Sequence, residues 1–259
     1  MTPLSRRLLL SALAAPTILP VARAEGVEIH VLSSGSFTAA YQRLRPEFER
    51  RTGHRLVSAF GASFGPAADA LPQRLGRGEP ADVVLALSEA LEALAQAGHV
   101  DPTSRTNLAE TRVAFAVRSS TPRPGMSNVD ALRAALLAAP SIAYSPSGSG
   151  LYFERELVQR LGIANQVLPK SRRWFPDRIG TVVARGDAEL GLQQVSELLP
   201  IQGIEIIRIP EEVQRVSFAS AAVATQARQP AAARQLIAFL GSPEASTVIA
   251  ETGLDPIRR

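Results

Sequence analysis

Residues 83–98 read VVLALSEALEALAQAG, and they combine two different hydrophobic patterns. The first five residues are a continuous apolar run, which is typical of a short strand buried on both faces of a sheet. From Ser88 onward, apolar residues recur at helical spacing until Gly98, a residue type that commonly ends helices. A buried strand that leads directly into a helix indicates an α/β protein with mostly parallel strands.

The same order of strand and helix occurs on both sides of this stretch. Before it, the patterns predict strands at 27–35 and 54–63 and helices at 37–53 and 67–82. After it, they predict strands at 112–118, 141–145, 203–210 and 216–225, a buried strand that ends at Gln193 and Gln194, and helices at 151–162 and within 229–253; residues 178–191 continue the second set of elements.

This order predicts two Rossmann-like lobes with mostly parallel sheets, joined by two crossing segments. The strand at 216–225 comes after the second set of strands and is expected to return to the first set. We therefore predict a first lobe of residues 25–108 plus 216–259 and a second lobe of residues 109–215, with the ligand cleft between them.

The N-terminus is typical of an export signal. Residues 1–24 contain a basic start with Arg6 and Arg7, an apolar middle and a small-x-small site that predicts cleavage after Ala24. The two arginines also fit a twin-arginine signal loosely, so export by the Sec or the twin-arginine route stays open. We expect the mature protein in the periplasm.

Composition excludes several classes of function. Three of the 28 Lys and Arg residues lie in the first 24 residues, so the rest of the chain is almost neutral against its 24 acidic residues, and we expect no nucleic-acid binding. The chain has no cysteine, which excludes disulfides and a thiol nucleophile. Its three histidines are scattered without metal-ligand spacing, and no nucleotide-binding fingerprint occurs. We expect no metal and no cofactor.

Three loops share one chemical character, because each follows a predicted strand, is rich in Ser and Gly, and precedes a helix. They are SSGSF (33–37), GASFG (61–65) and SPSGSG (145–150). Helix N-termini offer unpaired N–H groups and serine offers neutral donors, so loops of this kind can hold an anion. Parallel strands bring such loops to one edge. Together they predict an anion site in the cleft.

Four longer blocks resemble the periplasmic molybdate-binding proteins and their relatives, which have the type 2 periplasmic binding protein fold. The resemblance runs from about residue 27 to 240 and is carried by SGSFTAAYQRLRPEFERRTGHRLVSAFGASFG, GRGEPADVVLALS, SGSGLYFERELVQRLGI and VARGDAELGLQQVSE. It implies two lobes that close on an anion held by serine side chains and backbone amides.

The resemblance also implies individual site residues. Ser36 and Ser63 match the family's two oxyanion-binding serines, and Ser149 matches a backbone donor; the neighbouring Ser34 and Gly148 belong to the same candidate set.

Two other positions depart from the family pattern. Pro176 lacks the N–H that relatives use there, so this contact is lost or moves to Asp177 or Arg178. Gln194 replaces a tyrosine that reaches the oxyanion.

An amide at position 194 offers two donors and an acceptor, which suits a carboxylate better than a tetrahedral oxyanion. If the strand continues through Gln193 and Gln194, one of these side chains should face the cleft and the other should face away. Lys170, the only lysine of the chain, and Arg178 are weak candidates for pairing with a carboxylate or for proton transfer.

Two functions follow from these residues. The first is an exported solute-binding protein, expected to be a monomer, that holds a small oxyanion or carboxylate for uptake by an ABC transporter permease. The second is an enzyme, since some relatives of this family resemble aconitate isomerase, which moves a double bond by a 1,3-proton shift. No residue of the sequence stands out as the base for that reaction, so its catalytic residues stay unassigned.

Overall fold

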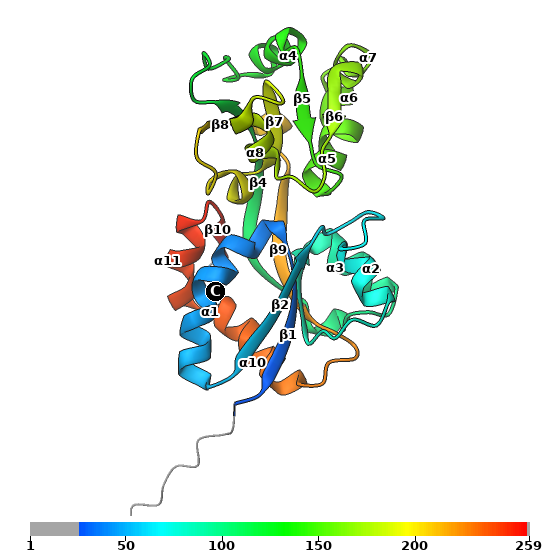
Figure 1. Ribbon diagram of the computed structural model, residues 1–259, viewed down its shortest axis with the longest axis vertical. Helices are drawn as coiled ribbons and strands as arrows, with labels where there is room; N and C mark the ends of the chain where they lie inside the picture. The colour runs from blue at the N-terminus through cyan, green and yellow to red at the C-terminus, as the bar shows by residue number, and fades with distance from the viewer. Residues whose placement is uncertain (1–25, 258–259) are drawn as a thin grey trace, which may run out of the picture.

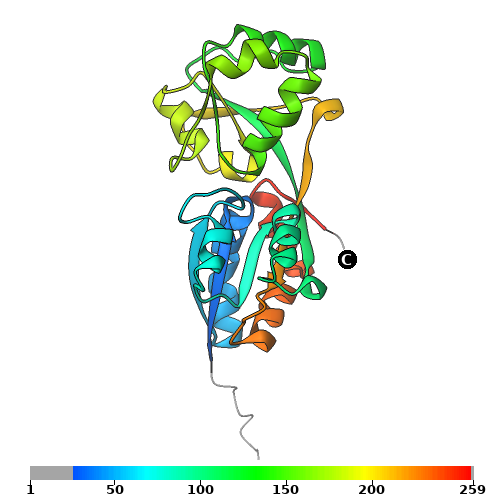
Figure 2. The ribbon, with the colours of Figure 1, turned by 90° about the vertical axis from the view of Figure 1, so that its right-hand side faces the viewer.

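The computed structural model describes residues 26–257 (Figures 1 and 2). The predicted signal peptide at 1–24 therefore lies outside the described residues. Within this range, no helix combines the length and the apolar character that crossing a bilayer would need.

The strands are β1 (Glu28–Ser34), β2 (Arg55–Gly61), β3 (Val83–Leu87), β4 (Thr106–Arg118), β5 (Ile142–Tyr144), β6 (Ser171–Arg173), β7 (Leu190–Gln194), β8 (Ile204–Arg208), β9 (Val216–Val223) and β10 (Asp255–Pro256). The α-helices are α1 (Gly35–Thr52), α2 (Leu71–Gly76), α3 (Ser88–Gln96), α4 (Val129–Ala138), α5 (Gly148–Tyr152), α6 (Val158–Arg160), α7 (Ala164–Val167), α8 (Ile179–Arg185), α9 (Val195–Leu198), α10 (Pro230–Leu240) and α11 (Pro243–Glu251). A π-helical turn at Phe153–Leu157 joins α5 to α6.

The lower half of the molecule in Figure 1 is built on the strand order β2-β1-β3-β9-β4. β1 runs parallel to β2 and β3, whereas β9 runs antiparallel to β3. Helices α1, α10 and α11 cover one face of this sheet, and α2 and α3 cover the other. Glycines with positive φ, Gly53 after α1 and Gly98 after α3, follow these helices as the sequence predicted.

The upper half has a second sheet in which β5 runs parallel to β6 and β7. Its core is rich in aromatic side chains, and Phe115 of β4 meets Phe153 edge-on with ring centroids 6.3 Å apart.

β4 belongs to both sheets. Its first part, up to Arg112, pairs with β9, and its second part, from Val113, pairs with β7 and β8. The predicted α/β fold is thus confirmed. Our division into residues 25–108 plus 216–259 and residues 109–215 stays a prediction; we call these parts lobe I and lobe II.

One ion pair, from Arg215 to Glu89, and one hydrogen bond connect the lobes on two sides. Arg215, which precedes β9, binds Glu89 of α3 at 3.1 Å and Glu156 of the π-helical turn at 2.5 Å. Burial alone would raise the pKa of Glu89, but hydrogen bonds from its own backbone, Arg215 and Ser217 outweigh burial and lower it. On the other side, the Ser196 hydroxyl of α9 donates to the Ser36 carbonyl of α1 at 2.9 Å.

The substitution Phe115→Ala tests the shared strand. Phe115 has no exposed surface, so we expect a loss of about 3–5 kcal/mol in the free energy of unfolding, from lost burial and the cavity left behind. Urea denaturation measures this loss. The control Leu137→Ala, at a side chain that is 38% exposed, should change stability by less than about 0.5 kcal/mol. Equal effects of the two substitutions would contradict the burial of Phe115.

Candidate functional site

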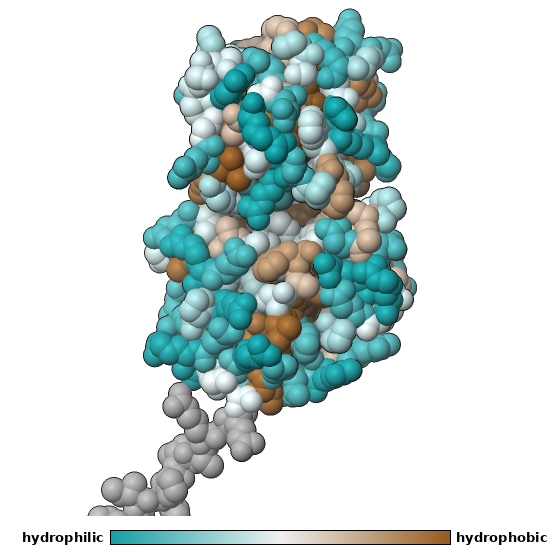
Figure 3. Space-filling view, viewed as in Figure 1, coloured by the Kyte–Doolittle hydropathy of each residue, from teal (hydrophilic) through white to brown (hydrophobic). Residues whose placement is uncertain are grey.

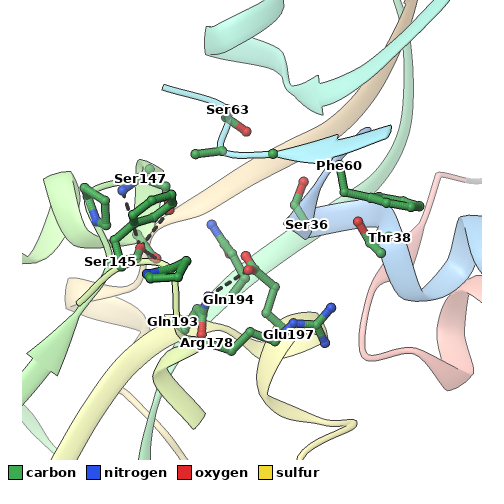
Figure 4. A pocket seen from close by; sticks show the side chains of 18 of the residues that line it. Ser36, Thr38, Phe60, Ser63, Ser145, Ser147, Arg178, Gln193, Gln194 and Glu197 are labelled. Carbon is green, nitrogen blue, oxygen red and sulfur yellow. Dashed lines mark hydrogen bonds between the residues drawn. The ribbon is translucent and has the colours of Figure 1, made fainter. Parts of the chain in front are cut away.

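The carboxyl ends of six strands surround one cavity of about 300 Å³. Residues at or just after the ends of β1, β2 and β3 line it from lobe I, and residues at or after the ends of β5, β6 and β7 line it from lobe II. The space-filling view shows the surface recessed between the lobes (Figure 3). Figure 4 shows the side chains that converge there.

The structure brings the predicted serines together. Ser36, Ser63 and Ser149 all line the cavity and are at least 94% buried, and Gly148 lines it as well. Ser34 lies behind this surface, with its hydroxyl oxygen 3.5 Å from that of Ser36. The cavity thus presents hydroxyl groups from both lobes.

Helix α1 starts at this cavity without a side-chain cap. Ser34 has extended backbone dihedrals and makes no capping bond, and no acidic residue lies in the first turn. The N–H groups of the first turn of an 18-residue helix therefore remain available beside Ser36, together with the positive end of the helix dipole.

Lys170 does not reach this cavity. It immediately precedes β6, so it lies at the amino end of a strand whose carboxyl end faces the cavity. Its Nζ donates instead to the Leu137 carbonyl at 2.5 Å. Lys170 is therefore not among the residues that line this cavity.

Arg178 does line the cavity, in the loop that follows β6. Its guanidinium makes no ion pair or hydrogen bond with the residues that the structure describes, and it is exposed. Asp177 beside it is paired with Arg185 at 2.7 Å. Arg178 is thus an available cation at the cavity wall.

Both glutamines of the β7 terminus line the cavity, so the expectation that one would face away is wrong. They leave the strand toward different neighbours. Gln193 reaches α9, and Gln194 reaches β4, where its Oε1 accepts from the Thr111 hydroxyl at 2.9 Å. Both glutamines belong to β7, and the cavity lies at the carboxyl end of that strand, where it contacts both side chains. The Nε2 group of Gln194 has no partner among the described residues and lines the cavity as a donor.

Glu197 is the residue of this site that we did not predict. Its Oε2 accepts from Gln193 Nε2 at 2.7 Å, and its carboxyl group contacts Gly35 at the start of α1. Burial raises the pKa of Glu197 to about 7, although the charge of Arg178 and the Gln193 hydrogen bond act in the opposite direction. A carboxyl group with this pKa can exchange protons near neutral pH.

A signal for Glu197 was present in LGLQQVSE, because an acid four residues after a glutamine at a strand–helix junction can bond to it. Burial raises the pKa of that acid, and burial is not a local property of the sequence. Ser145 and Ser147 also line the cavity and belong to the predicted serine-rich loop at 145–150, whereas the sequence did not point to Thr38, Gln42, Asp69 or Trp174.

Residues 26–257 contain no group of three or more His, Cys, Asp or Glu side chains placed to hold a metal ion. The cavity wall offers instead hydroxyl groups, amide donors, one unpaired guanidinium and one carboxyl group that titrates near neutrality. This set can bind an anion with several acceptor groups and can move a proton on it.

The chain is similar to known proteins over most of its length. Residues 29–255 match the model of a family described as bacterial extracellular solute-binding protein. Over 228 residues the chain is 40% identical to an aconitate isomerase from Pseudomonas sp, covering 88% of this chain and 87% of that protein. Over 244 residues it is 25% identical to the molybdate-binding protein ModA of Azotobacter vinelandii, covering 89% and 90%.

The fold is also similar to that of solved structures. The sulfate-binding protein SubI from Mycobacterium tuberculosis superposes with a TM-score of 0.70 at 17% identity, covering 89% of this chain and 87% of that one. This likeness concerns the fold alone.

The substitution Glu197→Gln should change how stability depends on pH. Between about pH 4.5, the ordinary pKa, and about pH 7, the folded protein keeps a proton that the unfolded chain has released. The free energy of unfolding therefore falls across this window, by about 3 kcal/mol in total. The Glu197→Gln variant has no carboxyl group to titrate at this position, so its free energy of unfolding should not fall in this way. It should be more stable than the wild type by about 3 kcal/mol at pH 8 and similarly stable at pH 4. Urea denaturation at both pH values measures the difference; equal profiles would contradict the raised pKa.

The substitution Gly35→Ala tests the contact with α1. A Cβ atom at this position would lie 2.3 Å from Glu197 Oε2, so the carboxyl group must move away from α1. We expect its pKa to fall toward the ordinary value, as followed by NMR titration of the side-chain carboxyl carbon. Gly125→Ala is the control, because nothing lies within 4 Å of a Cβ there. An unchanged Glu197 titration in Gly35→Ala would overturn this account.

Proposed function

Because the chain belongs to the bacterial extracellular solute-binding protein family, we propose that it uses the family's interlobe cleft to bind an unsaturated polycarboxylate and isomerise it. The reaction is a 1,3-proton shift that interconverts cis- and trans-aconitate. The single observation that carries this proposal is Glu197, an acid in the anion-binding cavity with a pKa of about 7.

The donors of the cavity suit a ligand with several carboxylates. Ser36 and Ser63 offer hydroxyls from lobe I, and Arg178 offers a planar pair of donors that matches a carboxylate. Gln194 presents Nε2 because the Thr111 hydroxyl occupies its Oε1. An acceptor-rich, elongated anion can satisfy these groups from both lobes at once, whereas a compact tetrahedral oxyanion reaches fewer of them.

The proposed reaction uses one acid/base group. The Glu197 carboxylate removes a proton from the methylene carbon of the substrate, and the electron pair delocalises over the allylic carbons and into the attached carboxylates. Arg178 and the cavity donors stabilise the added negative charge on those oxygens. Glu197 then returns the proton to the carbon at the other end of the allylic unit, and the double bond shifts by one position.

Two facts support Glu197 in this role. A base whose pKa lies near the working pH both accepts and returns a proton readily. The relative with 40% identity is named as an aconitate isomerase, and the similarity extends over 88% of this chain.

A second candidate function is delivery of an oxyanion or carboxylate to an ABC transporter permease. The family match and the serine-lined cavity favour this function, because delivery requires only that the ligand is bound and not converted. In either case we propose that residues 1–24 direct export and that the protein works in the periplasm.

Proton NMR of trans-aconitate mixed with the purified protein tests the proposal. We expect cis-aconitate to form until equilibrium is reached. Glu197→Gln should lower the rate by at least about 100-fold, because the acid/base group is lost, while trans-aconitate still raises the melting temperature of the variant. Retained turnover in this variant would exclude Glu197 as the base.

The same samples separate the two candidate functions. Thermal shifts with molybdate, sulfate, citrate and trans-aconitate identify the class of ligand. A wild-type protein that is stabilised by an anion but leaves trans-aconitate unchanged over hours is a binding protein, and the isomerase proposal is then wrong.

A further inference from the structure

The amide group of Gln193 is held at both ends. Its Oε1 accepts from the backbone N–H of Ile179, the first residue of α8, at 3.1 Å. Its Nε2 donates to Glu197 Oε2 at 2.7 Å. The side chain is 96% buried, so neither end competes with bulk water for its partner.

This arrangement determines the orientation of the amide. A backbone N–H can only donate, so the carbonyl oxygen of Gln193 must face Ile179 and the NH₂ group must face Glu197. One oxygen of the Glu197 carboxyl group, Oε2 in this structure, therefore receives this hydrogen bond. Glu197 Oε1 has no hydrogen-bond partner among the described residues, and it is the oxygen left free to take a proton.

The other side of the carboxyl group is also constrained. A Cβ atom on Gly35 would lie 2.3 Å from Oε2 and 3.1 Å from Oε1, so the carboxyl group packs against the backbone of α1. Gln193 from one lobe and Gly35 from the other thus restrict its rotation.

We propose that Gln193 is a positioning residue of the isomerisation: through the Ile179 N–H it holds Oε2 of Glu197, so that Oε1 exchanges the proton with the substrate. This inference rests on the proposed function. It assigns no contact with the substrate to Gln193, which acts through Glu197.

The same hydrogen bond tunes the acid. Donation from Gln193 stabilises the carboxylate and lowers the pKa of Glu197 against the effect of burial, which raises it. Without this donor the pKa should rise, and a smaller fraction of Glu197 would be ionised at neutral pH. Arg178 is the charged side chain that acts on the pKa of Glu197, and the positive end of α1 lies beside it. Asp69, Asp177 and Arg43 also line the cavities that Glu197 borders, and all of these groups remain in a Gln193 variant.

Gln193→Met tests the inference, because methionine has a similar size and no N–H donor. We expect kcat for trans-aconitate to fall about 10- to 100-fold with little change in KM, and the acid limb of the kcat–pH profile to move to higher pH. A residue that merely supports the fold would lower activity without moving that limb.

Gln194→Met is the matched control. Gln194 is the adjacent glutamine and lines the same cavity, but its amide oxygen is bonded to Thr111 and it makes no bond to Glu197. This variant should raise KM and leave the acid limb in place.

A second variant removes the orienting donor without changing Gln193 or Glu197. Ile179→Pro deletes the N–H at the first position of α8, where proline fits a helix, and Arg178 before it already has an extended backbone. We expect a shift of the acid limb in the same direction as in Gln193→Met. Circular dichroism shows whether each variant is folded, and a folded Ile179→Pro decides the question if Gln193→Met does not fold.

NMR titration of the Glu197 carboxyl carbon without substrate separates the two levels of the argument. If the wild type does not convert trans-aconitate, the proposed function fails. An upward move of the Glu197 titration in Gln193→Met would still support the hydrogen-bond arrangement. If the wild type is active but neither the titration nor the acid limb moves in the folded variants, Gln193 is not a positioning residue.

Discussion

One carboxyl group at the contact between the lobes organises the candidate site. Glu197 follows the last strand that ends at the cavity, and its carboxyl group packs against Gly35, the first residue of α1 on the other lobe. The contact with Gly35 exists only because the two lobes lie together as they do here. Burial of this group opposes its ionisation and therefore opposes folding at high pH, so the site trades stability for an acid that titrates near neutrality.

The fold supplies the remaining chemistry through strand direction. The strands that end at the cavity come from two sheets, and each is followed by a loop or helix start whose polar groups face inward. Helix α1 presents uncapped N–H groups beside Ser36, and the end of β7 presents Gln194. The result is a candidate anion site made of neutral donors and one exposed cation, Arg178, with the Glu197 carboxyl group beside them.

The connections between the lobes explain how such a site can be held together. β4 runs through both sheets, and the ion pair from Arg215 to Glu89 lies on one side of the cleft while the bond from Ser196 to Ser36 lies on another. Figure 2 shows the long strands β4 and β9 at the junction of the two halves. The donor groups of the two lobes are therefore held at fixed positions relative to one another, as the proposed elongated ligand requires.

The sequence by itself predicted most of the strands and helices, though not β6, β10 or α4, and the convergence of the serine loops. Both are local consequences: hydrophobic periodicity defines each element, and parallel strands bring their carboxyl ends to one edge. The resemblance to a known family added the identities of Ser36, Ser63 and Gln194 as site positions. Lys170 does not line the cavity, because the strand that follows it points its other end there.

Only the tertiary structure decided the chemical role of Glu197. Its pKa depends on burial between two lobes and on Gly35, which lies more than 160 residues earlier in the chain. Spacing within LGLQQVSE could suggest that Gln193 meets Glu197, but the Ile179 N–H that orients the amide comes from another element. Desolvation and orientation depend on atoms brought together by folding, so no local sequence pattern contains them.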